Sequence, residues 1–416
     1  MLFTTLLCGL AASTTLSLAA AVAPIKNEGV LASLVIPDTY IVKYKASADI
    51  LGCKDHEKDV DARAKKANKK GILGNFNMPG LQGYIAEISP SELADLLIRS
   101  PLIDYIEKDT IVKTATRHAP FTKHDNSNSM TRQHPAPWNL ARLSHRTHTR
   151  LNNEYTYHRT AGDGIPIYVL DTGIRLTHST FSSPSRAIWG VNFIPSSPDT
   201  DEDGHGTHVA GVIAGTTHGV AKRALVIAVK VLDRSGTGSM AGLVRALDWA
   251  VADARRRGGL GRAVVNMSVS GEYSQAVNDA VAAAVREGVT VVVAAGNDGA
   301  DVKGVSPGSA EMALTVGAVD ERDERAAISN WGVGVDIFAP GVGIVSAYNG
   351  SDVAEETMSG TSMAAPHVAG LAAYFIAKEG LSGSAKVMER ILSVATKGVG
   401  DRKEGADRIA YNDSDE

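Results

Sequence analysis

Apolar and polar positions follow one pattern before about residue 136 and another after it. In the later part, short runs are apolar at nearly every position, which is typical of strands buried on both faces. These runs are Ile165–Leu170, Leu225–Leu232, Ala263–Val269, Val289–Ala295 and Ala313–Val319. Helical patterns lie between and after them, at His205–Ala214, Ser239–Arg256, Tyr273–Glu287, Thr361–Lys378 and Ala385–Ala395. The alternation predicts an α/β fold in which helices flank a parallel sheet.

Residues 35–113 show shorter and more polar elements. Three segments alternate as half-buried strands do, and one densely charged segment is typical of an exposed helix. The strands are Thr39–Lys45, Leu81–Ile88 and Asp104–Val112, and the helix is Lys54–Lys70. Ser89 and Pro90 favour the start of a second helix, and the glycines and proline between residues 71 and 80 predict a turn region. A small α+β domain is therefore expected ahead of the larger one.

The first 25 residues carry no charged side chain, and small residues end this apolar run. We interpret residues 1–21 as a signal peptide, with a cut between Ala20 and Ala23. The alternative is a retained membrane anchor, because the run is almost long enough to cross a bilayer. No later stretch is long and apolar enough to do so, and no stable membrane association is expected.

Polar residues fill the stretch from 114 to 135, which predicts a solvated linker between the two domains. Three histidines are scattered through it, His118, His124 and His134. A histidine metal site is the alternative, but their spacing does not repeat as the spacing of metal ligands does.

Composition limits the partners and the compartment. The 416 residues suffice for two or three domains, and 44% of them are hydrophobic and 21% charged. The net charge of −4 provides no basic excess for a nucleic-acid partner. The two cysteines, Cys8 and Cys53, both precede the larger domain, which therefore holds no internal disulfide. Cysteine usage alone does not decide the redox compartment.

Ser362 stands among small residues, in Gly-Thr-Ser-Met-Ala-Ala-Pro-His, at the mouth of an apolar helical run. Small neighbours allow a substrate backbone to come close, and a helix N-terminus stabilises an oxyanion. Pro366 is expected to lie in the first turn of this helix, where its missing N–H costs little. Because a free serine hydroxyl is a poor nucleophile, Ser362 needs a base and an orienting acid.

Two polar residues follow predicted strands. Asp171 ends the strand Ile165–Leu170, at the edge of a parallel sheet where functional residues gather. Asn297 follows Val289–Ala295 and offers an uncharged donor to a developing oxyanion. Taken singly, each could equally be a turn-forming residue.

His205 is the candidate base, because glycines on both sides leave its ring uncrowded. His208 lies three residues further on, whereas a metalloprotease zinc pair needs a spacing of four with a glutamate between, so we reject zinc. His208 and His178 are expected to be structural, hydrogen-bonded histidines.

The chain order of these residues narrows the class of chemistry. Asp, His and Ser in that order is the subtilisin arrangement, whereas α/β-hydrolases place Ser first and chymotrypsin places His first. Residues from about Ala136 to Tyr411 resemble subtilisin-family serine proteases of the proteinase K branch, and residues 35–113 resemble the inhibitor propeptide of that family. The matching blocks are Asp171–Gly173, His205–His208, Ala294–Asn297 and Gly360–Ala364, with Pro137–Arg142 at the start of the domain.

The resemblance implies a role for each residue of the site. Ser362 attacks the peptide carbonyl, His205 takes and returns a proton, and Asp171 orients the imidazole. Asn297, together with the backbone N–H of Ser362, stabilises the oxyanion. By the same likeness, two segments flank the substrate backbone as extra strands. Because such pairing uses the main chain, it implies that many substrate side chains are accepted. They are Gly236, Thr237 and Gly238 in one, and Ser268, Val269, Ser270 and Gly271 in the other.

Departures from proteinase K qualify these expectations. Ser270 stands where relatives usually carry glycine, which narrows the first pocket, and Val209 replaces a free cysteine beside the catalytic histidine. No cofactor is expected for catalysis. The resemblance leaves a structural calcium ion open, because Asp336 fits the carboxylate ligand whereas Glu311 replaces a proline whose carbonyl coordinates the ion.

The expected organisation is a signal peptide at 1–21, an inhibitor-type propeptide at 22–116 and a subtilisin-like peptidase domain at 117–416, with the propeptide cut between 113 and 132. We expect a secreted, extracellular and monomeric endopeptidase, made as a self-processing zymogen. Its partners would be protein and peptide substrates and its own propeptide. The alternatives are a vacuolar processing protease of the same chemistry and a non-catalytic pseudoenzyme that binds proteins.

Overall fold

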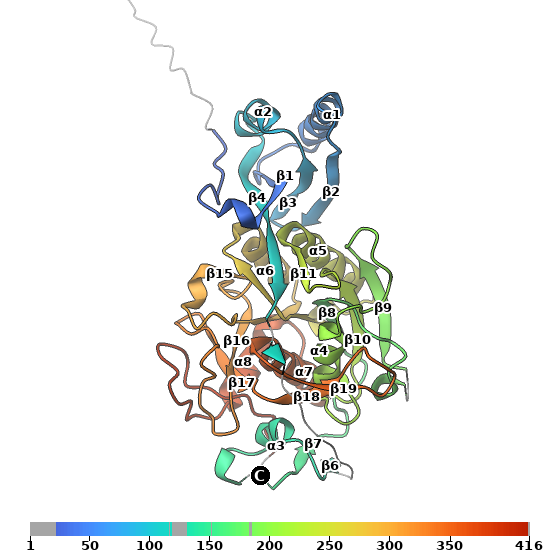
Figure 1. Cartoon of the computed structure of the whole chain (residues 1–416), viewed down its shortest axis with the longest axis vertical. Helices are drawn as coiled ribbons and strands as arrows, with labels where there is room; N and C mark the ends of the chain where they lie inside the picture. The colour runs from blue at the N-terminus through green and yellow to red at the C-terminus, as the bar shows by residue number, and fades with distance from the viewer. Residues whose placement is uncertain (1–21, 116, 119–130, 151, 183–184, 415–416) are drawn as a thin grey trace, which may run out of the picture.

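The computed structural model describes residues 22–115, 117–118, 131–150, 152–182 and 185–414. Figure 1 shows a small domain, residues 22–115, mounted on a larger α/β domain. The chain ends on the side of the larger domain that faces away from the small one. The predicted fold class is confirmed, since a parallel sheet flanked by helices follows a small α+β domain.

Seven parallel strands form the central sheet, in the order β17–β16–β14–β12–β8–β10–β9. They are β8 (Pro166–Asp171), β9 (Ala187–Asn192), β10 (Leu225–Lys230), β12 (Val264–Met267), β14 (Thr290–Ala294), β16 (Leu314–Val319) and β17 (Ile337–Pro340). The pattern of apolar runs predicted the five inner strands. It missed the two edge strands, because β9 is only partly buried and β17 is four residues long.

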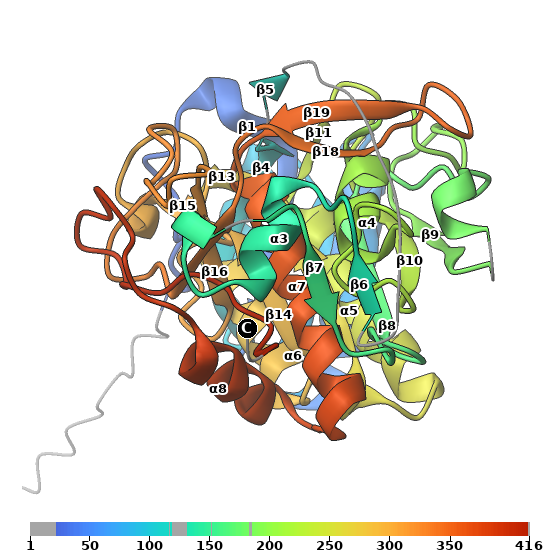
Figure 2. The same cartoon turned by 90° about the horizontal axis from the view of Figure 1, so that it is seen from below.

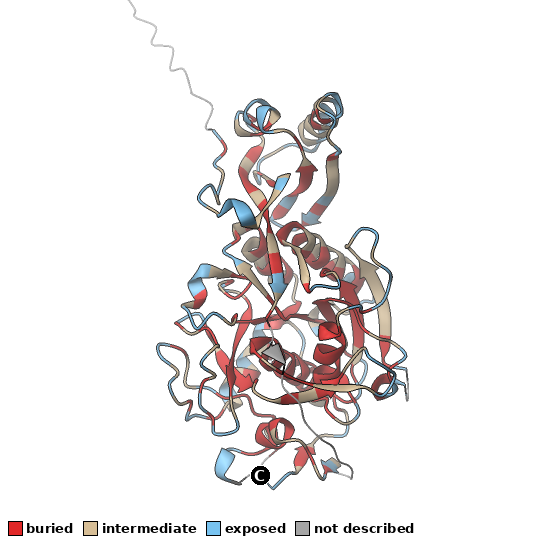
Figure 3. Ribbon diagram, in the orientation of Figure 1, coloured by how far each residue is buried: buried red, intermediate tan, exposed pale blue. Residues whose placement is uncertain are grey.

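Helices cover both faces of this sheet. On one face lie α4 (His205–Ala214), α7 (Thr361–Glu379) and α8 (Ser384–Val394), and on the other lie α5 (Met240–Arg256) and α6 (Gln275–Arg286). Within β8, Ile167 and Val169 join the first cluster whereas Tyr168 and Leu170 join the second, as the two-residue period of a strand requires. Helix α7 is buried from Thr361 to Ile376 and runs through the interior (Figure 3).

Serine side chains set the starts of α5 and α6. The Oγ atoms of Ser239 and Ser274 accept hydrogen bonds from the N–H groups of Gly242, at 2.9 Å, and Val277, at 3.1 Å. Such caps satisfy backbone donors that a helix cannot pair internally. No helix in the described ranges is both long and apolar enough to cross a membrane.

The small domain consists of four antiparallel strands in the order β4–β1–β3–β2 with helical segments beside them. They are β1 (Val35–Tyr44), α1 (Ile50–Lys66), β2 (Gly71–Met78), β3 (Leu81–Glu87), a short helical segment opened by α2 (Pro90–Glu92), and β4 (Ile103–Thr114). The predicted turn region was wrong for Gly71 and Gly74, which lie in β2. The pairing of β2 with β3 is irregular between Ile72 and Gly74, and glycine in a strand often marks such a bulge.

Strand β4 extends beyond the small domain into the larger one. There it pairs with β11 (Thr237–Ser239) on one side and β13 (Val269–Glu272) on the other, and β13 in turn pairs with β15 (Val305–Ser306). One sheet therefore spans both domains. The predicted strand Ala263–Val269 is divided between β12 and the first residue of β13.

Smaller elements close the larger domain. A second sheet consists of β5 (Arg117–His118), β18 (Ile344–Ala347) and β19 (Glu355–Ser359). Helix α3 (Trp138–Ser144) and the pair β6 (Thr131–Gln133) and β7 (Tyr155–Tyr157) lie on the face turned away from the small domain (Figure 2).

Arg142 in α3 ties the start of the larger domain to its later loops. Its fully buried guanidinium donates to Asp323 Oδ1 at 2.7 Å, to the carbonyl oxygen of His145 at 2.7 Å and to Thr396 Oγ1 at 2.8 Å. A buried charge is tolerated when it is paired and hydrogen-bonded in this way, and removal of one partner leaves the other charge uncompensated.

We predict that Arg142→Ala lowers the free energy of unfolding by about 3–5 kcal/mol, because the buried Asp323 would lose its guanidinium partner and keep only the contact with His148 Nδ1. Urea unfolding followed by circular dichroism measures this loss. The matched control is Arg223→Ala, since the Arg223–Asp163 pair is exposed on both sides and should contribute less than about 1 kcal/mol. Equal losses for the two variants would contradict the prediction.

Candidate active site

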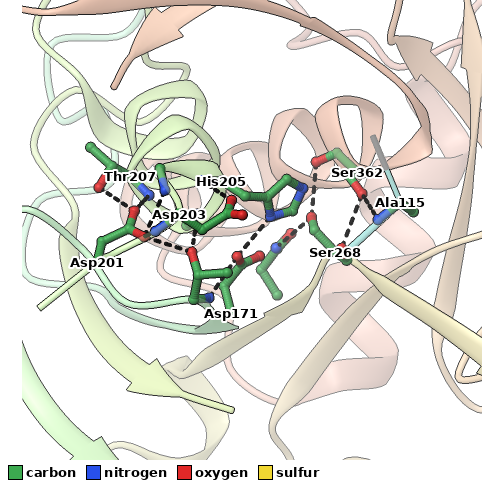
Figure 4. Close-up of polar contacts among 12 residues, drawn as sticks. Ala115, Asp171, Asp201, Asp203, His205, Thr207, Ser268 and Ser362 are labelled. Carbon is green, nitrogen blue, oxygen red and sulfur yellow. Dashed lines mark hydrogen bonds and ion pairs between the residues drawn. The ribbon is translucent and has the colours of Figure 1, made fainter. Parts of the chain in front are cut away.

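Three elements bring Asp171, His205 and Ser362 to the carboxyl edge of the central sheet. Asp171 is the last residue of β8, His205 is the first of α4 and Ser362 is the second of α7. All three are buried, with exposures of 0%, 1% and 0%. Figure 4 shows the His205 ring between the other two side chains.

Asp171 and His205 form a hydrogen-bonded pair. His205 Nδ1–H donates to Asp171 Oδ1 at 2.7 Å, and the N–H of Thr172 donates to the same oxygen at 2.8 Å. Burial alone would lower the pKa of His205, but the charge of Asp171 and this hydrogen bond raise it. With Nδ1 protonated, the neutral ring keeps its lone pair on Nε2, where a general base needs it. In the described part of the chain, Nε2 has no hydrogen-bond partner.

The Ser362 hydroxyl is engaged by backbone groups. It donates to the carbonyl oxygen of Ser268 at 3.0 Å and accepts from the N–H of Ala115 at 3.1 Å. Among the described residues Ser362 makes no hydrogen bond to His205 Nε2, since its hydroxyl donates to the carbonyl oxygen of Ser268. The Asp171–His205 pair is thus formed while the Ser362 hydroxyl is in contact with the chain's own N-terminal part.

A proline in α7 helps to hold Ser362. The helix begins at Thr361, so Pro366 lies within it and not in the first turn, which corrects the expectation from the sequence. Proline lacks the N–H that would bond the carbonyl four residues earlier, which is that of Ser362. Ser268 Oγ donates to this carbonyl instead, at 2.9 Å. Ser268 and Ser362 thus exchange two hydrogen bonds.

Asn297 lies beside Ser362 with its amide held in one orientation. Its Oδ1 accepts from both the N–H and the hydroxyl of Thr361, each at 2.9 Å. Its Nδ2 is buried and has no partner among the described residues. A Cβ on Gly360 would lie 2.7 Å from this Nδ2 and 2.4 Å from the carbonyl oxygen of Ala115. The free amide donor and a peptide carbonyl therefore meet at Gly360, whose φ of +152° also favours glycine.

Asp201 joins the strand that ends in Asp171 to the helix that begins with His205. Its carboxylate accepts from Thr172 Oγ1 at 2.8 Å and from the N–H and hydroxyl of Thr207 at 2.9 and 2.6 Å. Thr172 Oγ1 in turn accepts from the N–H of Gly206 at 2.9 Å. The sequence analysis did not single out Asp201 or Thr361. Thr361 was adjacent to the serine, but only the fold reveals its contact with Asn297.

His208 and His178 are hydrogen-bonded as expected. His208 Nε2 lies 3.0 Å from the carbonyl oxygen of Ile344 and 3.1 Å from that of Glu356, and it ties α4 to the β18–β19 ribbon. Burial, aided by the charge of nearby His205, lowers the pKa of His208 to about 3. His178 Nε2 lies 2.9 Å from the carbonyl oxygen of Ala354, and its Nδ1 accepts from the N–H of Thr180.

A peptide strand lies in the cleft between the two segments expected to bind substrate. On the first side, Thr237 and Gly238 pair with Lys113 and Val112, and the carbonyl oxygen of Gly236 accepts from the N–H of Thr114 at 3.0 Å. On the second side, Val269, Ser270 and Gly271 pair with Thr114, Lys113 and Val112. The strand between them is β4, so the chain's own small domain supplies this peptide.

The chain is held again on the far side of Ser362. Arg117 and His118 of β5 pair with Ser359 and Met358 of β19. Residue 116 lies outside the described residues, and so does most of the predicted linker. The bond that follows Ala115 is therefore flanked by paired segments on both sides.

Asp336 is remote from these residues and immediately precedes β17. Its Oδ2 accepts from the N–H of Thr315 at 2.8 Å, and burial raises the pKa of its carboxyl to about 6. Asp336 and Glu311 line one hollow of about 780 Å³. Across the described ranges, no three His, Cys, Asp or Glu side chains gather as a metal site. A calcium ion here would need backbone carbonyls and waters to complete its six to eight oxygen ligands.

Comparisons with known proteins identify families for both domains. A model of the subtilase family matches residues 162–409, and a model of peptidase inhibitor I9 matches residues 39–115. Subtilisin-like protease 3 of Pseudogymnoascus destructans is 44% identical over 395 residues, which cover 94% of each chain. A cuticle-degrading serine protease of Arthrobotrys oligospora is 39% identical over 98% of this chain and 97% of the other. The crystal structure of a cold adapted subtilisin-like serine proteinase matches with a TM-score of 0.63 at 36% identity, covering 67% of this chain and 98% of that one.

Fold and likeness together define a serine endopeptidase that carries an inhibitor-type domain ahead of its peptidase domain. The chain belongs to the subtilase family, and its relatives include proteases of the proteinase K branch. The family resemblance seen in the sequence is therefore confirmed.

We predict that Asn297→Ala lowers kcat by about 10²–10³ with little change in KM, because the amide would act on the oxyanion and not on the bound substrate. This magnitude was measured on a subtilisin and is carried over from it. Steady-state kinetics on a peptide p-nitroanilide provide the test, with exposed Asn152→Ala as control. A loss mainly in KM would mean that Asn297 binds ground-state substrate.

Proposed function

We propose that this chain is a secreted endopeptidase that hydrolyses peptide bonds through Asp171, His205 and Ser362 by way of an acyl-enzyme. The observation that carries the proposal is the peptide at Ala115, whose N–H lies 3.1 Å from Ser362 Oγ at the end of a strand paired on both sides. A peptide held by its main chain beside the nucleophile occupies the place of a substrate. Such pairing ignores most side chains, which supports broad specificity.

The steps follow from the positions of the groups. His205 Nε2 takes the proton from Ser362 Oγ as the oxygen attacks the carbonyl carbon, and the C–O bond forms while the carbonyl becomes an oxyanion. Asn297 Nδ2 and the N–H of Ser362 at the start of α7 donate to this oxyanion. The oxyanion then returns to a carbonyl as the C–N bond breaks, and the imidazolium, stabilised by Asp171, gives its proton to the leaving amine, so that an ester of Ser362 remains. Water attacks the ester by the same route and frees Ser362.

The proposal extends to maturation. We place a signal peptide at 1–21, the propeptide at 22 to about 116 and the peptidase domain from about 117 to 416. The pairing of β4 and β5 favours the bond after Ala115 as the site of self-processing, within the interval 113–132 expected from the sequence. The processed propeptide would stay bound as an inhibitor until it dissociates, and the enzyme would act as a monomer.

Secretion rests on the uncharged N-terminal run and on relatives such as the one named as a cuticle-degrading protease. A vacuolar protease of the same chemistry is the second candidate, and the N-terminal sequence of protein from culture medium and from cell extract would separate the two. A structural calcium ion at Asp336 stays part of the proposal. There it would offset the desolvation of the buried carboxylate and take no part in the reaction.

We predict that Ser362→Ala yields a folded precursor that neither cleaves peptides nor processes itself, because the other hydroxyl at this helix start, that of Thr361, is bound to Asn297 Oδ1. Gel mobility and mass spectrometry of the purified protein detect processing, and a fluorophosphonate probe labels the wild-type serine. Exposed Ser393→Ala should process normally. Self-processing of pure Ser362→Ala protein would disprove the assignment, and absence of labelling in the wild type would favour a pseudoenzyme.

Two buried carboxylates of β4 attach the propeptide to the peptidase domain. Glu107 accepts from the hydroxyl of Ser274 and from the N–H of Ala276 at the start of α6. Asp109 accepts from the N–H of Ala241 at the start of α5, at 2.9 Å. Burial raises the pKa of Glu107, and it raises that of Asp109 to about 7, although the helix N–H groups oppose the shift.

This arrangement predicts a propeptide complex that weakens as pH rises. A carboxyl with a higher pKa in the complex than in the separated propeptide takes up a proton on association. The complex is therefore most stable below the ordinary carboxyl pKa of about 4. Its dissociation constant rises toward pH 7, by at most about tenfold per pH unit for each carboxyl.

The measurement is the rate at which the processed complex, diluted into a fluorogenic peptide at several pH values, gains activity. Asp109→Asn should flatten the pH dependence of propeptide release relative to the wild type. Asp95→Asn, at an exposed position of the same domain, should leave it unchanged. The same pH slope in Asp109→Asn and wild type would disprove a role for Asp109.

A further inference from the structure

Ser270 gives strand β13 a polar side chain beside the segment that the chain places in the cleft. In the paired sheet, Ser270 lies directly opposite Lys113 of β4. Directly opposed residues of antiparallel strands project to the same face, and so do residues two apart on one strand. Strand β4 ends at Thr114 and Ala115 follows it directly, so from this alternation we infer that the side chains of Ser270 and Ala115 lie on the same face.

The Ser270 hydroxyl reaches across to the neighbouring strand end. A Cβ placed on Gly296 would lie 3.0 Å from Ser270 Oγ and 2.5 Å from Asn330 Nδ2. Gly296 directly precedes Asn297, whose Nδ2 and the carbonyl oxygen of Ala115 would both lie within 3 Å of a Cβ on Gly360. The hydroxyl thus lies between β13 and the backbone that leads to Asn297.

The residue that the chain itself places at this point is small. Ala115 is 5% exposed, and its side chain is a single methyl group. A larger side chain there would meet Ser270 Oγ and the Gly296 backbone. Forcing extra atoms into a filled, rigid space displaces its walls and is destabilising.

We propose that Ser270 determines the specificity for the residue on the amino side of the cleaved bond and restricts it to small side chains such as Ala and Ser. This inference rests on the proposed function and deepens it. The residues further from the bond are held by main-chain pairing and stay permissive. Selection among substrate side chains is therefore concentrated at the residue on the amino side of the cleaved bond, where the Ser270 side chain takes up space.

The test compares kcat/KM for two peptide p-nitroanilides that differ only in Ala or Phe at the last position. The wild type should favour Ala by about tenfold or more, the scale at which one added group is rejected by a pocket. Ser270→Gly should raise kcat/KM for the Phe substrate and shrink the Ala preference by about tenfold. Ser270→Ala, which removes only the hydroxyl, should fall between the two, and remote Ser393→Ala should keep the wild-type ratio.

Several outcomes separate this inference from the proposed function. Activity on both substrates with a Phe preference in the wild type, or an unchanged ratio in Ser270→Gly, would overturn the role of Ser270 and leave the peptidase intact. A fluorophosphonate titration counts the active sites, so that ratios compare equal numbers of working enzyme. No turnover of either substrate by titratable wild-type enzyme would count against the proposed function itself.

Self-processing of the full chain provides a second readout. Ala115→Phe should slow processing of the precursor, and the added change Ser270→Gly should restore much of the rate. A merely structural role for Ser270 would predict no such rescue. Processing of Ala115→Phe at the wild-type rate and at the same bond would disprove the inference.

Discussion

Main-chain pairing of β4 with β11 and β13 is the interaction that holds the small domain's last strand in the cleft, and the rest of this arrangement depends on it. It uses backbone groups that nearly every residue carries, so the surface that holds the chain's own segment is suited to many extended peptides. Glu107 and Asp109 add attachments at the starts of α6 and α5 that an ordinary peptide would lack. Inside the cleft the propeptide thus resembles a substrate. Outside the cleft it differs from one, because Glu107 and Asp109 attach it to the two helices.

The carboxyl edge of the central sheet concentrates polar atoms that the described structure leaves unpaired. Asp171 Oδ2, His205 Nε2 and Asn297 Nδ2 are all buried without a partner in the described ranges. Such groups cost about 1–3 kcal/mol each, and they keep their positions only because neighbours hold them there. Asp201 and Thr361 provide this support, and the apolar packing around α7 supplies stability elsewhere. The site is therefore costly to the fold and is organised for a reacting group.

The periodicity of apolar residues predicted the helices and inner strands of the larger domain, because burial on one or two faces leaves a pattern within each segment. It could not reveal β2, where Gly71 and Gly74 resembled a turn, since a bulge in a paired strand depends on its partner. The residues of the site could be singled out by type and order. Their contacts could not, because the bonds of Ser362 to Ser268 and Ala115 join residues far apart in the chain.

Strand β4 belongs to two structures at once. Its first part pairs with β1 in the core of the small domain, and its last part pairs with β11 and β13 beside Ser362. The number of residues between these pairings fixes which peptide bond reaches the serine. One inserted residue would bring a different bond into place and turn each later side chain to the opposite face. In the proposed self-processing, the length of β4 therefore selects the bond by distance, in addition to any selection by side chains.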